Sequence, residues 1–276
     1  MPIEQEMPLA GRAVDALAHV LLDHVACVAW SGGKDSSAVL GLVLQAALRL
    51  RTQGVSVAPI LITHGDTLVE NPEVRAYADA EIARIRAWGL EHGVAVKVLV
   101  ARPNLTESWQ MRVIGGKGLP AFPGGNHDCT TDMKIQPMQR LRKKVHREMD
   151  QDADRPVVTI IGTRFEESPQ RAARMRERGE SPEQVWTGDD GALYFSPIAL
   201  WGMDDVWEYL GYCRSAHPDF LTFSRFEDVF RIYADAAGTT APSWATWPRR
   251  ASPSRAARAP DAPCAPPSGA TRAWRP

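Results

Sequence analysis

Residues 25–37 read VACVAW-SGGKDSS, an apolar run that passes directly into two glycines, a lysine and several serines. The run Val25–Trp30 is short, apolar and bounded by turn residues, which is typical of a buried parallel strand. The following stretch, Ser36–Arg51, carries apolar residues on one face at helical spacing. These residues therefore predict a strand–loop–helix unit, and the loop is the point from which the rest of the chain can be interpreted.

The loop has the composition of an anion-binding turn. Gly32 and Gly33 lack side chains, so the backbone can wrap an anion and adopt positive φ where needed. The free N–H groups at the start of the helix would point at phosphate oxygens. Ser31 and Ser36 add hydroxyl groups and Lys34 adds charge. The pattern is not GxxxxGK[ST], so a Walker A loop is excluded. The alternative is a plain glycine-rich turn that caps a helix.

Three further apolar runs predict strands, at 58–63, 94–100 and 157–162. Helical patterns lie between them, at 72–92 with Pro72 at its start, and at 131–150 with a basic segment. Strands that alternate with helices indicate βαβ units. We therefore expect an α/β fold with a doubly wound, mostly parallel sheet and a ligand at the carboxyl edge of its strands.

The chain changes character near Gly238. Residues 239–276 contain eight prolines and no Leu, Ile, Val, Phe or Met. Such a segment cannot bury enough apolar surface to offset its ordering entropy. We expect one domain over 1–238 and a disordered low-complexity tail over 239–276. The Ala/Arg/Pro/Ser bias also suggests a frameshift near codon 238 that replaced the native C-terminus, and a natural low-complexity tail is the alternative.

Composition excludes several classes of protein. Hydrophobic residues make up 44% and charged residues 24% of the 276, as in ordinary globular proteins. No apolar run approaches the roughly 20 residues that span a bilayer, and the N-terminus is not a signal peptide, so we expect a cytoplasmic protein. Residues 239–276 carry six Arg and one Asp, so residues 1–238 hold 26 basic and 32 acidic residues. The body thus gives no bulk electrostatic support for DNA binding.

The four cysteines are scattered and show neither a CxxC pair nor zinc-type spacing. Cys27 lies in the middle of a predicted strand and, like Cys213, is expected to be a buried small apolar residue. Cys129 follows a glycine-rich loop. Cys264 lies in the predicted tail.

The SGGKDSS loop resembles the signature SGGxDS of the PP-loop ATP pyrophosphatase superfamily. Four further blocks, in order and spacing, look like the phosphoadenosine phosphosulfate (PAPS) reductase family. The resemblance covers about residues 20–235. The blocks are HGDT (64–67) with ENPE (70–73), CTTDMKIQP (129–137), GTRFEES (162–168) with Arg171, and SPI (196–198) with Trp201.

Within that family the details look most like the DNA phosphorothioation sulfurtransferases of the DndC type. The resemblance implies an ATP-dependent enzyme that releases pyrophosphate and replaces a non-bridging oxygen of a DNA phosphate with sulfur. It implies ATP and Mg²⁺ as cofactors, and as partners DNA, other phosphorothioation proteins and a cysteine desulfurase that donates sulfur. It also implies a [4Fe–4S] cluster held by a C-terminal cysteine block. Because the resemblance stops at Gly238, we expect that cluster to be absent or incomplete here.

The candidate site combines the loop with the later blocks. Arg164 and Arg171 offer fork-shaped donors for phosphate or sulfate, and Lys134 adds a point charge. Asp35 or Asp66 could hold Mg²⁺. Cys129 stands where the family carries a conspicuous cysteine, and the resemblance makes it a candidate for sulfur chemistry or for iron–sulfur ligation. The proposed catalytic residues are Lys34, Asp35, Cys129 and Arg164. The proposed cofactor-binding residues are Ser31, Gly32, Gly33, Asp35, Ser36, Ser37, Thr63, Asp66, Thr67, Lys134 and Arg171.

Three alternatives remain open. The first is a PAPS or adenylylsulfate reductase of sulfate assimilation, although Cys264 stands in APCAPP, unlike the reductases' C-terminal ECGLH-like segment, and Cys129 is single. The second is an inactive, truncated nucleotide-binding remnant. The third, a tRNA-thiolating PP-loop enzyme, is disfavoured by the GTRFEES and SPIALW blocks.

Overall fold

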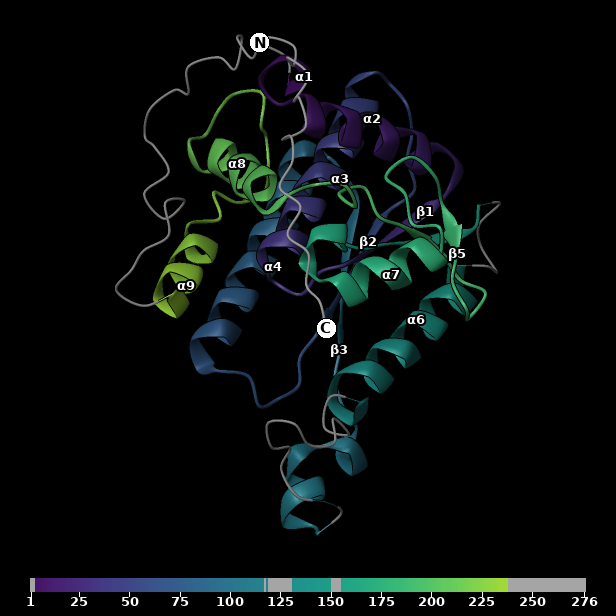
Figure 1. Ribbon diagram of the computed structural model, residues 1–276, viewed down its shortest axis with the longest axis vertical. Coiled ribbons are helices and arrows are strands. Elements are labelled where there is room, and N and C mark those ends of the chain that lie inside the picture. Colours follow the sequence, from purple (N-terminus) through teal and green to yellow (C-terminus); the bar gives the residue numbers. More distant parts are fainter. Residues whose placement is uncertain (1–2, 117, 119–130, 150–154, 238–276) are drawn as a thin grey trace, which may run out of the picture.

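The computed structural model describes residues 3–116, 118, 131–149 and 155–237. Within these ranges the chain forms an α/β fold built around one six-stranded sheet, in the order β3-β2-β1-β4-β6-β5 (Figure 1). The predicted tail 239–276 and the candidate Cys129 lie outside the described residues. The strands are β1 (Val25–Ala29), β2 (Ile60–Gly65), β3 (Val96–Ala101), β4 (Val157–Ile160), β5 (Trp186–Thr187) and β6 (Leu193–Phe195).

The sheet is parallel except at one edge. β1 pairs in parallel with both β2 and β4, so that Cys27 lies level with Leu61 on one side and Thr159 on the other. Only the pair β5–β6 is antiparallel among the described strands. The strand order reverses at β1, because the chain runs outward to β2 and β3 and then returns to β4. A crevice at such a switch point is where open α/β sheets bind ligands.

Helices cover both faces of the sheet. They are α1 (Ile3–Glu6), α2 (Pro8–Asp23), α3 (Lys34–Thr52), α4 (Pro72–His92), α6 (Gln136–Met149), α7 (Pro169–Glu177), α8 (Met203–Arg214) and α9 (Glu227–Ala237). Short helical turns lie at η1 (Leu105–Glu107), η2 (Gln110–Ile114), η3 (Thr131–Ile135) and η4 (Phe165–Glu167).

The larger core lies on one face, where Val28, Ile62 and Ile160 of the sheet pack against α2, α3, α4, α8 and α9. On the other face, α6 places Val145 against Val25 and Cys27. Because β1 is buried on both faces, it must be apolar at every position, as its sequence VACVA is.

The predicted elements are confirmed with shifted ends. The strand expected at 58–63 runs from Ile60 to Gly65, and the one at 94–100 runs from Val96 to Ala101. The helix at 72–92 is bounded as predicted, because Asn71 caps its start through the Glu73 amide and Gly93 ends it with positive φ. The helix expected at 131–150 begins instead with the π-helical turn η3.

Within the described ranges, no helix combines the length and apolar character needed to cross a membrane.

Candidate functional site

The glycine loop joins the end of β1 to the start of α3. Tyr77 of α4 contacts it. Gly32 has φ +80°, a conformation that side-chain-bearing residues rarely adopt. A Cβ atom at Gly32 would lie 3.2 Å from Cε1 of Tyr77. The Tyr77 hydroxyl in turn donates to the Gly32 carbonyl oxygen at 3.1 Å. The second glycine, Gly33, caps α3.

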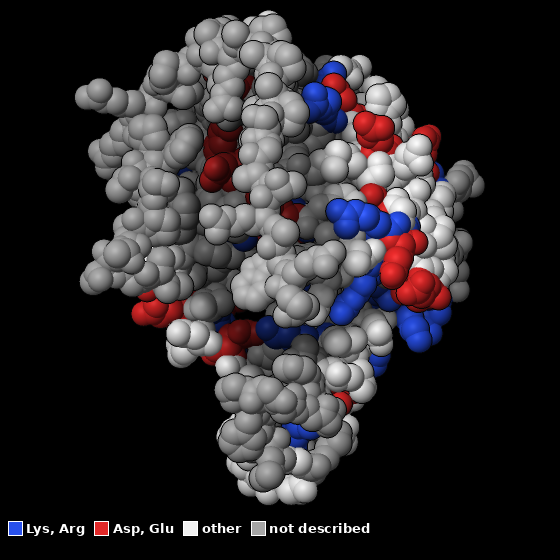
Figure 2. Space-filling model, in the orientation of Figure 1, with Lys and Arg blue, Asp and Glu red and all other residues white. Residues whose placement is uncertain are grey.

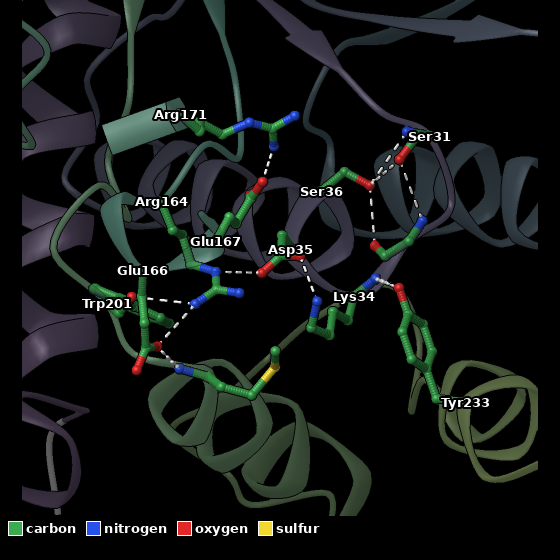
Figure 3. A network of polar contacts seen from close by, with 12 residues as sticks. Ser31, Lys34, Asp35, Ser36, Arg164, Glu166, Glu167, Arg171, Trp201 and Tyr233 are labelled. Carbon is green, nitrogen blue, oxygen red and sulfur yellow. Dashed lines mark hydrogen bonds and ion pairs between the residues drawn. The ribbon is translucent and has the colours of Figure 1, made fainter. Parts of the chain in front are cut away.

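Hydroxyl groups surround the polar backbone of the loop (Figure 3). The Ser31 amide donates to Ser36 Oγ at 3.2 Å, and Ser36 Oγ donates to the Gly33 carbonyl at 3.0 Å. The Gly33 amide lies 3.4 Å from Ser31 Oγ, and the Lys34 amide lies 3.5 Å from the Tyr233 hydroxyl. Both of these bonds are long, so a charged phosphate oxygen can take over the Gly33 amide, while the Lys34 amide points at the Tyr233 hydroxyl.

Asp35 joins the two principal cations of the site (Figure 3). Its Oδ2 accepts from Lys34 Nζ at 2.8 Å, and its Oδ1 accepts from Arg164 Nε at 2.6 Å. The Arg164 side chain is only 1% exposed, and its Nη1 lies 3.3 Å from the Trp201 carbonyl. The carboxylate therefore fixes both positive groups beside the first turn of α3.

A second layer of ion pairs surrounds this cluster. Glu166 Oε2 lies 3.3 Å from Arg164 Nη1 and accepts from the Met203 amide at 2.5 Å. Arg171, whose side chain is half exposed, forms an ion pair with Glu167 one turn earlier. Arg171 thus lies at the rim of the cluster, whereas Arg164 lies at its centre.

Gly162 allows the segment that carries Arg164 to lie against the start of α3, which carries Asp35. A Cβ atom there would lie 3.0 Å from the Asp35 carbonyl carbon and 3.2 Å from the Ser36 nitrogen. These neighbours are backbone atoms, which cannot move aside as a flexible side chain can. Glycine at this position allows the segment after β4 to approach α3 closely enough for Arg164 to reach Asp35.

Two cavities flank the loop. The first, which we call the apolar cavity, has a volume of about 580 Å³ and includes Trp30, Val74, Tyr77, Ile82, Val100 and Met138 in its wall. The second, the charged cavity, has a volume of about 740 Å³ and includes Lys34, Asp35, Arg164, Glu166, Glu167 and Arg171. Ser31, Gly33 and Tyr233 line both. A third cavity of about 540 Å³ lies beneath α6, beside Cys27 and Thr159. Ala29 lines all three.

Asp66 and Lys134 lie on the polar side of the apolar cavity. Asp66 Oδ2 lies 3.0 Å from Arg102 Nε and 3.6 Å from Arg75, and its Oδ1 accepts from the Leu68 amide. Burial alone would raise the pKa of Asp66, but the Leu68 amide and the two arginines outweigh it and lower that pKa. Lys134 Nζ lies 3.6 Å from Glu70 and is largely exposed.

Three predicted cofactor-binding residues are buried and have hydrogen-bond partners within the protein, and of these only Thr63 lines one of the three cavities. Ser37 is fully buried, and its Oγ accepts from Trp30 Nε1 at 3.2 Å. Thr67 is buried and donates to Glu70 at 2.9 Å. Thr63 lines both the apolar and the third cavity, and its hydroxyl donates to the Val28 carbonyl at 3.3 Å.

The donor set does not suit Asp35 as a magnesium ligand. Both of its carboxylate oxygens are engaged by cations, Lys34 and Arg164. Both oxygens of Asp66 are also engaged, by the Leu68 amide and by arginines. No group of three or more His, Cys, Asp or Glu side chains in the described residues is arranged to hold a metal ion.

The cysteines within the described ranges are structural, as their sequence context predicts. Cys27 is 1% exposed in β1, and burial raises the pKa of its thiol to about 11. Cys213 is buried in α8, and burial also raises its pKa. These two thiols lie in different elements and provide no four-thiolate set for an iron–sulfur cluster.

Sequence reasoning missed Tyr233, Tyr77 and Gly162 as residues of the site. Gly162 stands in the GTRFEES block, so its position was available from the sequence. Tyr77 and Tyr233 read as ordinary members of amphipathic helices, and only the fold brings them to the loop.

Comparison with curated proteins gives no match. Among solved structures, the chain is similar to Candida glabrata FMN adenylyltransferase in complex with FMN and the ATP analogue AMPCPP, at 12% identity and a TM-score of 0.41. That similarity covers 74% of this chain and 58% of that one, so the chain spans less than two thirds of that protein. It is also similar to NAD⁺ synthetase from Burkholderia pseudomallei, at 17% identity and a TM-score of 0.37, covering 62% of this chain and 73% of that one.

A comparison with protein-family models identifies the domain family of this chain. The match is to the phosphoadenosine phosphosulfate reductase domain and extends over residues 25–216. These limits run from β1, through the glycine loop and Arg164, to the end of α8. The chain therefore belongs to the phosphoadenosine phosphosulfate reductase domain family.

Proposed function

We propose that this chain is an ATP-dependent sulfurtransferase of DNA phosphorothioate modification. It adenylates a DNA phosphate with ATP, releases pyrophosphate, and lets a sulfur nucleophile displace AMP. The observation that carries the proposal is the position of the glycine loop, which separates an apolar cavity from a charged one. A nucleoside triphosphate has the matching division into an apolar base and an anionic chain.

The apolar cavity supports binding of the base and ribose. Trp30, Tyr77 and Ile82 offer aromatic and aliphatic surface, and burial of apolar area contributes about 25 cal/mol per Å². Asp66 lies at the end of β2, where an acidic side chain can accept hydrogen bonds from ribose hydroxyl groups.

The charged cavity supports stabilisation of the leaving pyrophosphate. Lys34 and Arg164 are both positioned by Asp35 beside the first turn of α3, so positive charge is already placed where negative charge would develop. The amides of Gly33 and Lys34 add fixed dipoles at the start of α3. Phosphate binding must exchange with the carboxylates of this cavity, because Lys34, Arg164 and Arg171 each have a carboxylate partner.

The DNA assignment rests on the sequence resemblance and on one surface feature. Lys143, Lys144 and Arg147 are exposed on α6, whose first turns lead to the apolar cavity. Figure 2 shows positive and negative side chains interspersed on the described part of the face it presents, rather than a single basic field. DNA contacts would therefore be local. A cysteine desulfurase would deliver the sulfur, and the other phosphorothioation proteins would complete the system.

The first test measures pyrophosphate release from ATP in the presence of DNA and a sulfur donor. We expect Lys34→Ala to reduce release at least a hundredfold, because one electrostatic contact at the departing group is lost. Lys97→Ala is the matched control, since this lysine is exposed on β3 and lines neither the apolar nor the charged cavity. Equal release from all three proteins would remove the assignment of the active site.

A second test measures phosphorothioate linkages in DNA of the host with the gene intact, deleted, or carrying Lys34→Ala. Loss of the linkages in both altered strains supports the DNA role. Linkages that persist after deletion contradict it.

The family match itself favours a second candidate, a PAPS or adenylylsulfate reductase. The charged cavity, with Arg164 and Arg171, suits a sulfate group as well as a phosphate. Sulfite release from either substrate with thioredoxin, without pyrophosphate release from ATP, would establish this function instead. ATP binding with neither product would identify an inactive nucleotide-binding remnant.

A further inference from the structure

Tyr233 is the residue of α9 that reaches the glycine loop. It lies 199 positions after Lys34, and its hydroxyl oxygen is 3.5 Å from the Lys34 amide nitrogen (Figure 3). Its ring lies beneath Lys34, whose Nζ is 5.4 Å from the ring centroid. A Cβ atom built on Gly33 would be 3.4 Å from the same hydroxyl. Tyr233 also lines both the apolar and the charged cavity, so it stands at the boundary between them.

The position of Tyr233 is fixed by packing and by buried polar contacts of α9. Trp207 packs against Phe230 at 5.0 Å and edge-on against Tyr233 at 5.3 Å between ring centroids. Glu81 of α4, whose side chain is 1% exposed, accepts a hydrogen bond at 2.9 Å from Ser224, just before α9. These contacts hold the helix, and with it the tyrosine, against the loop.

A hydroxyl at this point can serve two partners. A tyrosine oxygen accepts a hydrogen bond while its O–H group donates another. The Lys34 amide supplies the donor for the first bond. An anionic oxygen bound at the start of α3 would accept the second, and hydrogen bonds to charged groups are stronger than neutral ones.

We propose that Tyr233 is a phosphate-binding residue, whose hydroxyl donates to the phosphoryl oxygen held beside the Lys34 amide and so fixes where the phosphate chain crosses from one cavity to the other. This inference rests on the proposed binding of a nucleotide at the loop. It adds a specific donor from α9 to the glycine-loop donors.

The test compares Tyr233→Phe with the wild type in binding ATP and adenosine, measured by calorimetry. Phenylalanine keeps the ring beneath Lys34 and against Trp207, so only the hydroxyl is removed. We expect ATP to bind about tenfold more weakly, as for loss of one hydrogen bond to a charged group, and adenosine to bind unchanged. Tyr212→Phe is the control, because its ring stacks on Phe220 in another part of the core, and both ligands should bind it as they bind the wild type.

Unchanged or tighter ATP binding by Tyr233→Phe overturns the inference, and so does an equal loss for ATP and adenosine, which indicates a packing role. The outcome separates this inference from the proposed function. Hydroxyl-dependent ATP binding without pyrophosphate release contradicts the proposed function alone. Pyrophosphate release with hydroxyl-independent ATP binding contradicts the inference alone, and no ATP binding by the wild type overturns both.

Discussion

The apolar and charged cavities share the glycine loop but use opposite physical means. The apolar cavity offers aromatic and aliphatic walls, with its ion pairs confined to the polar side around Asp66. The charged cavity is built around Asp35, which holds Lys34 and Arg164. A ligand in the first would be held mainly by apolar area removed from water. An anionic ligand in the second would be held by exchange between ion pairs, and its binding would weaken as salt rises. The comparison teaches that one short loop can border two cavities of opposite chemistry.

The largest expected effect comes from Arg164→Ala in the charged cavity. This change removes a buried guanidinium from Asp35, Glu166 and the Trp201 carbonyl. We expect the free energy of unfolding to fall by about 3 kcal/mol, measured by urea denaturation, and pyrophosphate release to be lost.

Arg171→Ala is the matched control, because that side chain is half exposed and pairs with Glu167 only four residues earlier. Its cost should stay below about 1 kcal/mol. Equal costs for the two variants would contradict the assignment of Arg164 to the centre of the cluster.

The second-largest effect is expected at Gly162, which we compare with Gly65 on the other side of the loop. Gly162→Ala places a methyl group about 3 Å from the backbone of Asp35 and Ser36, so the segments on either side must separate. We expect a loss of about 1–3 kcal/mol in unfolding free energy and a matching fall in activity. Gly65→Ala, beside the apolar cavity, meets only the Met138 side chain at 3.6 Å and should cost less. A reversed order would refute the role of Gly162 in close approach.

A smaller effect concerns Asp66. Its pKa is lowered in the folded protein, so the unfolded chain takes up the proton first as pH falls. The stabilising contribution is therefore fully present above the usual Asp value of 3.8 and is lost as pH drops below it. Asp66→Asn should remove about 1 kcal/mol at neutral pH and make stability less dependent on pH in acid. Denaturation curves from pH 7 down to about pH 2 test this, and an identical dependence of unfolding free energy on pH below 3.8 for both proteins would contradict it.

The smallest effect is expected at Cys27, beneath the loop. Burial raises the pKa of this thiol to about 11, so the folded protein should not react with iodoacetamide at Cys27 at pH 8. Mass spectrometry of labelled peptides, with urea-unfolded protein as the reactive control, measures this. Rapid labelling in the folded state would show that β1 is accessible from one of the cavities.

Local signals in the sequence predicted the elements, because their causes are local. The helix Pro72–His92 has a cap, a proline at its start and a glycine at its end, and all three lie within its own sequence. The fold class followed from the alternation of such elements. The two-residue strand β5 was missed, since it exists only by pairing with β6.

Many residues of the site could be predicted from the sequence, but the contacts between them could not. Asp35 and Arg164 were both candidates, yet their bond joins residues 129 positions apart. Nothing in either segment indicates that contact, because the order of the strands creates it. Tyr233 shows the same limit more strongly, since its helix carries no motif and reaches the loop only through packing on Trp207.

Ala29, the last residue of β1, lines all three cavities. Alanine has the smallest side chain after glycine, so this shared stretch of wall adds little bulk. A larger side chain at position 29 would have to take up space in one or more of the cavities, and it would do so without changing any charged residue.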